Sequence, residues 1–347
     1  MNTWSFEILT DWDEIWGKVH LARWNEYFKC AFNQHVFFES SIVKAWTDTY
    51  LPIRDLTPIF IWAKDSRGNI AFLPLVLWQR NWKNAFIRSI VPVGYSDFDY
   101  HNPIFNENPQ DINSFWKDLQ DCISQRFKYD EFIIDGITDS YTDKSSSWHQ
   151  QEICPWLSLK GINNEDDLYT FLPTKLRGDI RRQIRRLNDI GTLTYQIYQT
   201  YEDAIKTFDA FMTAHRKKWP NAYKATHFHE RILKEGLLTK CVHFSSLNLN
   251  NTPIAWHLGF QHKGRYYYYM PAGNYDFAKY SPVKIHLFYL IKDAIHNKFE
   301  IFDHLRGNEN YKNGWSNDYQ HVHSLRFYDK SIVTNIKLLI LKTRKMI

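Results

Sequence analysis

Two adjacent side chains in the second half of the sequence could transfer protons. Asp303 and His304 follow residues 299–302, an apolar run that is typical of a β-strand. Groups at the carboxyl ends of strands in α/β sheets often contact ligands, and a histidine titrates close to neutral pH. The pair is therefore a candidate general base, with Tyr311 as a candidate acid. The alternative is that Asp303 caps a turn and His304 lies on the surface.

A helix start in the same half could bind an anion. Ser281 is a favourable N-cap residue, Pro282 suits the first helical position, and Lys284 adds a positive charge. The unpaired amides and the positive dipole end of a helix N-terminus attract phosphate groups. An ordinary, well-capped helix would have the same sequence, so both interpretations stay open.

A strongly basic helix is expected over residues 175–187. Only Asp179 opposes its five arginines, which are Arg177, Arg181, Arg182, Arg185 and Arg186. A solvated cationic face is one interpretation. The other is an anionic partner, such as a nucleotide-linked sugar, a lipid-linked phosphate or tRNA. Because the basic run is confined to one helix, nucleic acid is the less favoured partner.

The next predicted helix ends at Pro220 and carries two further candidates. His215 could contact a substrate, and Trp219 could stack on a sugar ring, although a core position fits Trp219 equally well. His227 and His229 are two residues apart and no further ligands complete a set around them, so we expect no metal site.

The elements that must position these residues occur twice. Each half is predicted to contain a β-hairpin, a third strand, a helix, and a strand that ends in aspartate. Residues 92–98 match residues 271–277 at four of seven positions, which are Pro, Gly, Asp and Phe. A helix between two strands implies a crossover and locally parallel strands. We therefore predict a mixed α/β fold that is duplicated, with domains at 1–150 and 151–347.

Composition narrows the class of protein. The chain has 347 residues, 44% hydrophobic and 23% charged, which is long enough for two globular domains and too apolar for a disordered chain. Its four cysteines form no CxxC pair, and no signal peptide or membrane span is visible, so a reduced cytoplasmic protein is expected. Residues 336–347 are apolar with interspersed lysines. This tail is predicted to pack as a terminal element or to attach weakly to an acidic membrane surface, peripheral to the inner membrane.

Three segments of the second half resemble the GNAT acetyltransferases that are associated with cellulose and exopolysaccharide synthesis in bacteria. They are residues 176–191, 280–287 and 302–315, and the last is similar to the signature F-D-x-x-x-G-x-x-x-Y-K-x-x-W. Similar text at residues 71–75 and 94–98 extends the resemblance into the first half. Tandem GNAT folds are also the architecture of the Fem-type peptidoglycan bridge transferases, which resemble this group.

The resemblance implies an acyl-CoA-dependent N- or O-acyltransferase, most simply an acetyltransferase, for a sugar or cell-envelope polysaccharide precursor. An acyl-CoA donor such as acetyl-CoA, used without a metal, would lie against a set of residues around the third strand and the helix start: Met270, Ala272, Ser281, Val283, Lys284 and Ile285. Backbone amides near residues 270–273 would stabilise the oxyanion. The family usually has glycine where Val283 stands, and a β-branched side chain narrows the approach of a phosphate to the backbone.

The acceptor is expected to contact side chains from both halves: Asp97, Arg181, Arg185, His215, Trp219, Arg306, Lys312 and Trp315. Two alternatives remain. One is a Fem-type aminoacyl transferase that uses charged tRNA, although the long coiled-coil insertion common in that group is not visible here. The other is a non-catalytic module that binds glycan or scaffolds a synthase complex.

Overall fold

The computed structural model describes residues 3–142 and 147–344. The chain divides into two compact units, which are Met1–Glu152 with His321–Ile347 (unit 1) and Ile153–Gln320 (unit 2). The division near residue 152 lies close to the expected boundary. The second predicted domain, however, ran to residue 347, whereas the structure assigns 321–347 to unit 1. The reason is a long-range strand pairing that local sequence patterns do not reveal. Residues 143–146, which precede the expected boundary, and residues 345–347 of the tail lie outside the described residues.

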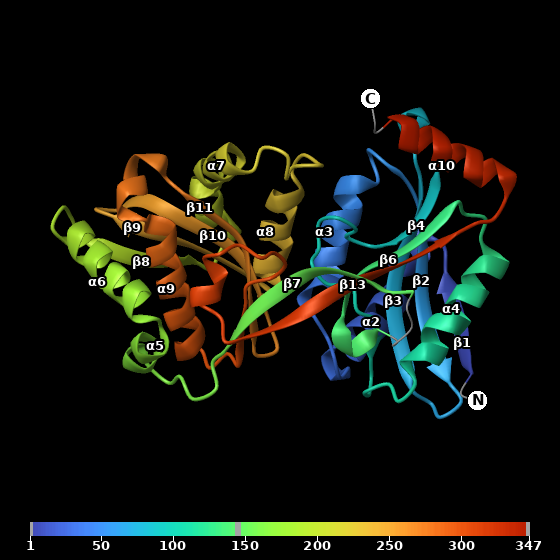
Figure 1. The fold of residues 1–347 in the computed structure, drawn as a ribbon, viewed down its shortest axis with the longest axis horizontal. Helices are drawn as coiled ribbons and strands as arrows, with labels where there is room; N and C mark the ends of the chain where they lie inside the picture. The colour runs from blue at the N-terminus through green and yellow to red at the C-terminus, as the bar shows by residue number, and fades with distance from the viewer. Residues whose placement is uncertain (1–2, 143–146, 345–347) are drawn as a thin grey trace. The chain divides into compact units, whose positions relative to one another are not determined.

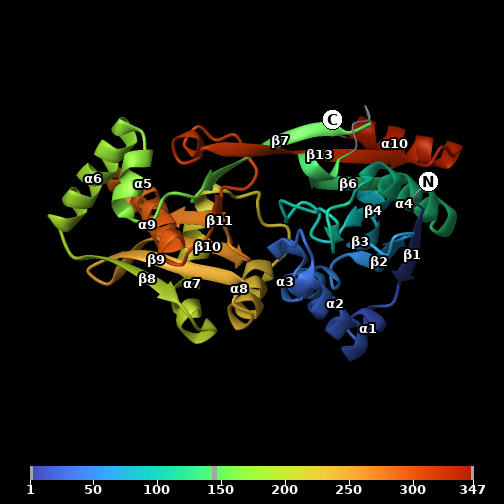
Figure 2. The same ribbon diagram turned by 90° about the horizontal axis from the view of Figure 1, so that it is seen from below.

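Unit 1 contains a mixed sheet in which β1, β2, β3, β4, β6 and β13 follow one another (Figure 1). The strands of this unit are β1 (Trp4–Leu9), β2 (Asp55–Asp65), β3 (Ile70–Gln79), β4 (Arg88–Pro92), β5 (Ile104–Phe105), β6 (Glu131–Thr138) and β13 (Asp318–Tyr328). Its helices are α1 (Trp12–Ile15), α2 (Lys18–Cys30), α3 (Ser40–Tyr50), α4 (Ile112–Arg126) and α10 (Ile332–Arg344). The last strand, β13, pairs antiparallel with β6, and Figure 2 shows the two strands side by side. This pairing is what brings the C-terminal segment into unit 1.

Local chemistry explains the first hairpin of unit 1. The carboxylate of Asp65 accepts hydrogen bonds of 2.8 Å from the backbone amides of Arg67 and Asn69 and so closes the turn between β2 and β3. Gly68 has a φ of +93°, a conformation that glycine adopts without steric cost. Large aromatic side chains fill the space between this hairpin and the helices, and the rings of Trp24 and Phe72 lie 4.9 Å apart. Many of the aromatic side chains of unit 1 therefore form its core.

In unit 2 the strands of the mixed sheet follow one another in the order β7, β12, β11, β10, β9 and β8. Its strands are β7 (His149–Ser158), β8 (Leu193–Tyr198), β9 (Val242–Leu249), β10 (Thr252–His262), β11 (Arg265–Gly273) and β12 (Ile301–Asp303). Its helices are α5 (Glu165–Phe171), α6 (Thr174–Asn188), α7 (Tyr201–Lys218), α8 (Phe228–Leu238) and α9 (Pro282–His296). Only β11 and β12 are parallel neighbours among these strands, and α9 makes the crossover between them.

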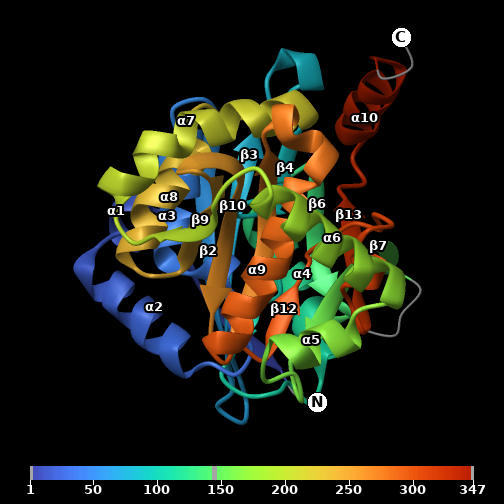
Figure 3. The same cartoon turned by 90° about the vertical axis from the view of Figure 1, so that its left-hand side faces the viewer.

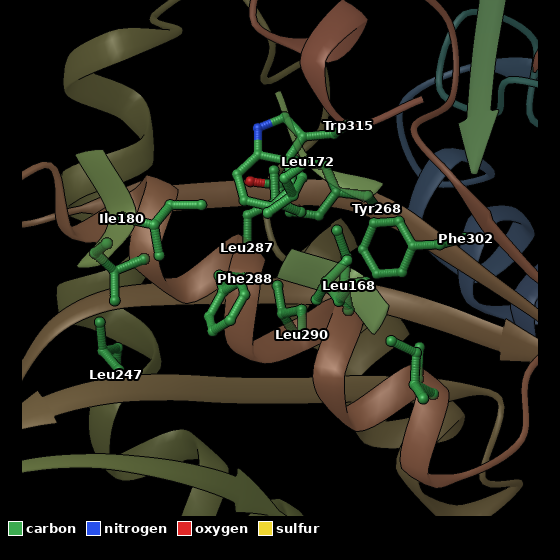
Figure 4. Close-up of a cluster of buried hydrophobic side chains, with 14 of the residues drawn as sticks. Leu168, Leu172, Ile180, Leu247, Tyr268, Leu287, Phe288, Leu290, Phe302 and Trp315 are labelled. Carbon is green, nitrogen blue, oxygen red and sulfur yellow. The ribbon is translucent and has the colours of Figure 1, made fainter. Parts of the chain in front are cut away.

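Helices cover both faces of the unit 2 sheet (Figure 3). Because side chains alternate along a strand, Tyr266 and Tyr268 of β11 point toward α9, while Tyr269 lies near His229 of α8 on the other face. Figure 4 shows the core between α6, α9 and the sheet, where Leu172, Leu287 and Trp315 meet. Helix α7 packs on β11 from the opposite face.

The two units repeat one order of elements. In unit 1 the order is β2, β3, β4, α4 and β6, and in unit 2 it is β9, β10, β11, α9 and β12. In each unit the strands on either side of the crossover helix pair in parallel, as the sequence predicted. The mixed α/β fold with a large mixed sheet is thus confirmed. Within the described part of the chain, no helix combines the length and the apolar character needed to cross a bilayer.

Candidate functional site

The parallel strands of unit 2 separate at the place where the sequence predicted an acyl site. The pairs between β11 and β12 end with Tyr267 opposite Asp303. Beyond this pair β12 stops, whereas β11 continues to Gly273. A 3₁₀ helix at Tyr275–Tyr280 then leads into α9. The end of β11 and the start of α9 are therefore adjacent, and both offer backbone amides to the space between them.

A pocket of about 240 Å³ opens at this junction. Its walls come from the end of β11, the 3₁₀ helix, the first turn of α9 and the last turns of α7. The lining residues are Ala214, Lys218, Pro271, Ala272, Gly273, Asn274, Tyr275, Ala278, Ser281, Pro282, Val283 and Lys284. Of the six residues predicted to hold the donor, four line the pocket. The other two, Met270 and Ile285, are buried beside it.

Ser281 begins α9 in an unexpected conformation. Its φ of 52° and ψ of 50° are left-handed, and its side chain makes no capping hydrogen bond. An N-cap residue normally has an extended backbone, which aims its oxygen at the amides of the first turn. The expected side-chain cap is therefore wrong. The backbone carbonyl of Ser281 instead accepts from the amides of Lys284 and Ile285 at 3.0 Å and 3.2 Å. Pro282 has no amide hydrogen, so the group of the first turn that could receive an anionic ligand is the amide of Val283.

Val283 fills part of the space where a phosphate would approach the backbone. A Cβ atom placed on Gly273 would lie 2.6 Å from Cγ2 of Val283, so the two residues are in close contact across the pocket floor. The β-branched side chain of Val283 therefore lies against the glycine that ends β11, and it narrows the space through which a phosphate would approach the backbone. Since Gly273 has no side chain, it compensates for the bulk of Val283.

The positive charges at the pocket are not equivalent. The ammonium of Lys284 lies 2.7 Å from Oδ2 of Asp179 on α6, and this hydrogen bond is the main cause that lowers the pKa of Asp179. Lys284 is therefore largely neutralised by its own chain. Lys218, on the opposite wall, is exposed and pairs with no carboxylate in the described chain. Sequence reasoning missed Lys218; the available signal was the basic end of α7, next to Trp219.

Asp303 and His304 are both buried, and neither lines the pocket. Asp303 forms an ion pair of 2.6 Å with Arg265, and its other oxygen accepts a hydrogen bond of 2.8 Å from the amide of Leu305. The turn-capping alternative for Asp303 therefore describes one of its contacts, whereas the surface position considered for His304 is wrong. Asp303 holds the start of the following loop against β11.

His304 lies among aromatic rings. Its Nε2 is 3.3 Å from the carbonyl oxygen of Trp315, and its Nδ1 is buried without a hydrogen-bond partner in the described structure. The rings of Tyr268 and Phe302 lie 5.9 Å and 5.2 Å from its own. Burial lowers the pKa of His304 to about 3, so the imidazole is neutral at neutral pH.

The loop after β12 is held mainly by Lys312. Its buried ammonium donates hydrogen bonds to three backbone carbonyls, those of Leu305, Arg306 and Gly307, and pairs with Glu309 at 2.9 Å. Trp315 is buried in the core cluster of unit 2 (Figure 4). Tyr311 is exposed. Lys312 and Trp315, expected as substrate contacts, thus contact this chain, while Tyr311 and Arg306 keep solvent access.

The remaining predicted contacts are distributed over several elements. Arg181 and Arg185 are exposed on α6, and the guanidinium of Arg181 lies 4.3 Å from the ring centre of Tyr169. His215 is buried on α7, bonded to the hydroxyl of Tyr223, and burial lowers its pKa to about 4.

Trp219 is exposed just after α7. Asp97 belongs to unit 1, where it accepts a hydrogen bond of 3.1 Å from Nε1 of Trp46, and its contact with the substrate stays a prediction. No group of three potential metal ligands was found among the residues that the structure describes.

Comparison with known proteins identifies the domain of unit 2. Residues 174–313 match the family model of the acetyltransferase (GNAT) domain. Among curated protein sequences, none matches this chain. The matched segment contains α6, the pocket, β12 and most of the loop that follows. Unit 2 therefore carries a GNAT acyltransferase domain, and the predicted enzyme class is confirmed at this level.

Several solved structures share the fold of the whole chain. FemX is 11% identical with a TM-score of 0.61, and the match covers 92% of this chain and 98% of FemX. The C-terminal domain of a putative lysylphosphatidylglycerol synthetase from Agrobacterium fabrum is 9% identical with a TM-score of 0.58, over 93% of this chain and 94% of that domain. A conserved protein of unknown function from Bacteroides thetaiotaomicron is 12% identical with a TM-score of 0.53, over 88% and 97%. Identities this low show a common fold alone.

Proposed function

We propose that the chain is an acyl-CoA-dependent N- or O-acyltransferase whose acceptor is a sugar or a cell-envelope polysaccharide precursor. The observation that carries the proposal is the pocket between the end of β11 and the start of α9, within the segment that matches the GNAT domain. The acceptor class rests on the resemblance to the exopolysaccharide-associated acetyltransferases, which is carried by residues 176–191, 280–287 and 302–315.

The pocket offers the groups that a thioester donor linked to a pyrophosphate requires. The amide of Val283 in the first turn of α9 and the ammonium of Lys218 would bind the phosphates. The backbone after Tyr267 of β11, where pairing with β12 has ended, would hold the acyl group and donate hydrogen bonds to the developing oxyanion. Gly273 leaves the room that these contacts need, because any side chain at this position would meet Val283.

Acyl transfer breaks the thioester C–S bond, forms a C–N or C–O bond, and moves one proton from the acceptor to the leaving thiolate. Tyr311 is exposed on the loop after β12, and we assign it to that thiolate as the acid. A base with a pKa of about 3 is weak at neutral pH, so His304 in this state serves better to position the loop through Trp315. Asp303 acts on the same loop through Leu305.

Acceptor binding is assigned to the exposed polar groups of unit 2. Arg181 and Arg185 on α6, with Arg306 on the loop after β12, offer charge to a phosphorylated or nucleotide-linked sugar. Trp219 offers an exposed indole face for the sugar ring itself.

A second candidate is an aminoacyl transferase of the Fem type. Two observations favour it: the contact between Val283 and Gly273 narrows the phosphate approach, and the FemX fold matches nearly the whole chain. In this alternative the exposed arginines of α6 would bind the acceptor stem of a charged tRNA rather than a nucleotide-linked sugar.

The first test is calorimetric titration with acetyl-CoA and with free CoA. We expect saturable binding that weakens about tenfold in Lys218→Glu, because a repulsive charge replaces an attractive one beside the phosphates. Lys206→Glu is the matched control: it makes the same change on the same helix, at a lysine that pairs with Asp203 and does not line the pocket. Absence of binding at millimolar ligand would reject the acyl-CoA donor and favour the aminoacyl alternative.

A further inference from the structure

We propose that unit 1 docks on an anionic phospholipid surface through α10 and the hairpin tip between β3 and β4. This inference goes beyond the proposed function and does not depend on it. It rests on three features that lie in unit 1: an outward apolar face, exposed aromatic rings beside it, and a basic groove along its flank.

The outward face of α10 is apolar. Its side chains are between 39% and 78% exposed, and the residues are Ile332, Val333, Ile336, Leu339 and Ile340. Their spacing of three to four residues places most of them on one side of the helix. An amphipathic helix normally buries such a stripe against its own core, so an apolar stripe that faces solvent indicates an external partner.

Polar contacts fix the opposite side of α10 to unit 1. The hydroxyl of Thr334 donates to Oδ1 of Asp130 at 2.8 Å, and the ammonium of Lys337 lies 2.8 Å from Oδ2 of the same residue. Hydrogen bonds from these groups and from the amide of Arg88 lower the pKa of Asp130 against the effect of its burial. The helix is therefore anchored by its polar side, and this anchoring turns the apolar side outward.

Two aromatic side chains extend the apolar surface. Trp82 and Phe86 lie on the hairpin tip and are 61% and 57% exposed. Lys337 joins this tip to α10, because its ammonium also donates to the carbonyl oxygen of Phe86 at 3.2 Å. Trp and Phe rings are the side chains that proteins insert at the boundary between lipid headgroups and acyl chains.

A basic groove of about 900 Å³ runs along the flank of α10. Four cationic residues line it, with one acidic residue: Arg88, Lys128, Arg326, Lys330 and Asp329. Of the four, Arg88 is paired at 3.4 Å with Asp130, so the charge available to a ligand comes mainly from the other three. Asn335 brings α10 into the same lining. Positive charge beside an apolar stripe matches an anionic bilayer, whose phosphates lie directly above its acyl chains.

The charges beside the apolar face of α10 favour a lipid surface over a second copy of this chain as its partner. Two copies that met through the apolar faces of α10 would bring their flanking cations together, whereas an anionic bilayer attracts those cations. A helix of 13 residues is about 20 Å long, which is shorter than the roughly 30 Å core of a bilayer. We therefore infer that α10 lies in the interface and does not cross the membrane.

Sedimentation with vesicles tests the proposal on the full chain. We expect binding to phosphatidylcholine vesicles that contain phosphatidylglycerol, little binding to pure phosphatidylcholine, and release at high salt. The double variant Ile336→Glu/Leu339→Glu should weaken binding at least about tenfold, and Lys330→Glu with Lys128→Glu about fivefold per lysine or more. Val19→Glu is the matched control, because Val19 is 87% exposed on α2 in the same unit.

Light scattering measures the oligomeric state of the chain, and thermal melting checks that each variant is folded. All substituted residues are exposed, so the melting temperature of each variant should stay close to that of the unchanged chain. Absence of binding to the anionic vesicles at low salt would overturn the proposal. It would also be overturned if the chain were a dimer that Ile336→Glu/Leu339→Glu dissociates, since the apolar face would then bind a second copy.

Discussion

The two units carry similar short sequences at the end of their third strand, identical at four of seven positions, but the chain that follows folds differently in each unit. In unit 2, Gly273 lies against Val283 at the start of α9, and both residues line the pocket. In unit 1, the corresponding Gly94 has a φ of +81°, and a Cβ atom at Gly94 would lie 1.8 Å from Cδ2 of Phe98. The chain therefore turns back on itself, with the amide of Phe98 donating to the carbonyl of Gly94 at 2.9 Å, and the ring of Phe98 closes the space.

The segment that follows strengthens this difference. In unit 1, the amide of His101 donates to the carbonyl of Gly136 at 3.0 Å, and the side-chain oxygen of Asn102 accepts from the amide of Thr138 at 2.9 Å. An inserted segment thus bonds along β6, at the level where β12 in unit 2 has stopped pairing with β11. The two units therefore share the order of their elements but differ in the local structure that follows the third strand. The site depends on how the chain leaves the third strand.

The largest expected difference between the units is in acid stability. Burial lowers the pKa of His286 and His304 in unit 2 to about 3, from the ordinary value of 6.5. The unfolded chain then binds more protons than the folded one below pH 6.5, so stability falls as the pH decreases from 6.5 toward 3. Each of these histidines should cost about 2 kcal/mol at about pH 5.

Hydrogen exchange followed separately in each unit measures this effect. Unit 1 serves as the comparison: burial also lowers the pKa of its His20, whereas in unit 2 burial lowers the pKa of His215 to about 4 and those of His229, His286 and His304 to about 3. We expect unit 2 to lose protection first between neutral pH and about pH 5. Equal loss in both units would contradict the comparison.

A smaller effect, confined to the affinity for the donor, is expected when a larger side chain fills the pocket. Gly273→Val should weaken acetyl-CoA binding about 100-fold or more, because the new side chain would meet Val283 and fill the donor space. Adding Val283→Gly to this variant should recover part of the affinity. Titration calorimetry of the single and double variants measures both changes.

Two other glycines provide matched controls for that experiment. Gly178→Ala lies on α6 in open space and should change neither binding nor stability by much. Gly94→Ala should lower the stability of unit 1, because of its positive φ and its contact with Phe98, while donor affinity stays unchanged. Loss of donor binding in Gly94→Ala would break the distinction between the two units.

The smallest effect is expected at Asp97. Asp97→Asn keeps an oxygen that can accept from Trp46, so we expect about 1 kcal/mol less stability and less than about a twofold change in donor affinity. Thermal melting and calorimetry measure these two quantities. Turnover with the acceptor tests the predicted substrate contact of Asp97 independently, and a large loss at unchanged melting temperature would support that contact.

Local signals predicted the framework of unit 2 well. The helix at residues 175–187 and the junction of β11 with α9 follow from apolar spacing and from a Ser-Pro helix start, and both are present. Tertiary packing determines which partners the side chains contact, and local sequence patterns do not predict those partners. Lys312 and Trp315 belong to a signature that suggested substrate contact, but tertiary burial assigns one to loop carbonyls and the other to the core.

Long-range contacts account for the other features that the sequence did not predict. The position of Lys218 at the pocket depends on how α7 packs against β11, and the spacing of residues within α7 does not predict that contact. The place of residues 321–347 in unit 1 depends on a partner strand, β6, that lies far away in the sequence. Strand pairing of this kind is set by the complete fold rather than by local propensity.

The position of β13 also has a consequence for synthesis on the ribosome. Every strand of unit 2 leaves the ribosome before Asp318–Tyr328, the strand that pairs with β6 of unit 1. A nascent chain that ends before residue 318 contains β7 to β12, while the edge of β6 still lacks its partner. Since an unpaired edge favours wrong pairing, unit 1 can be completed only after residues 318–328 have been made, although most of its residues are made before unit 2.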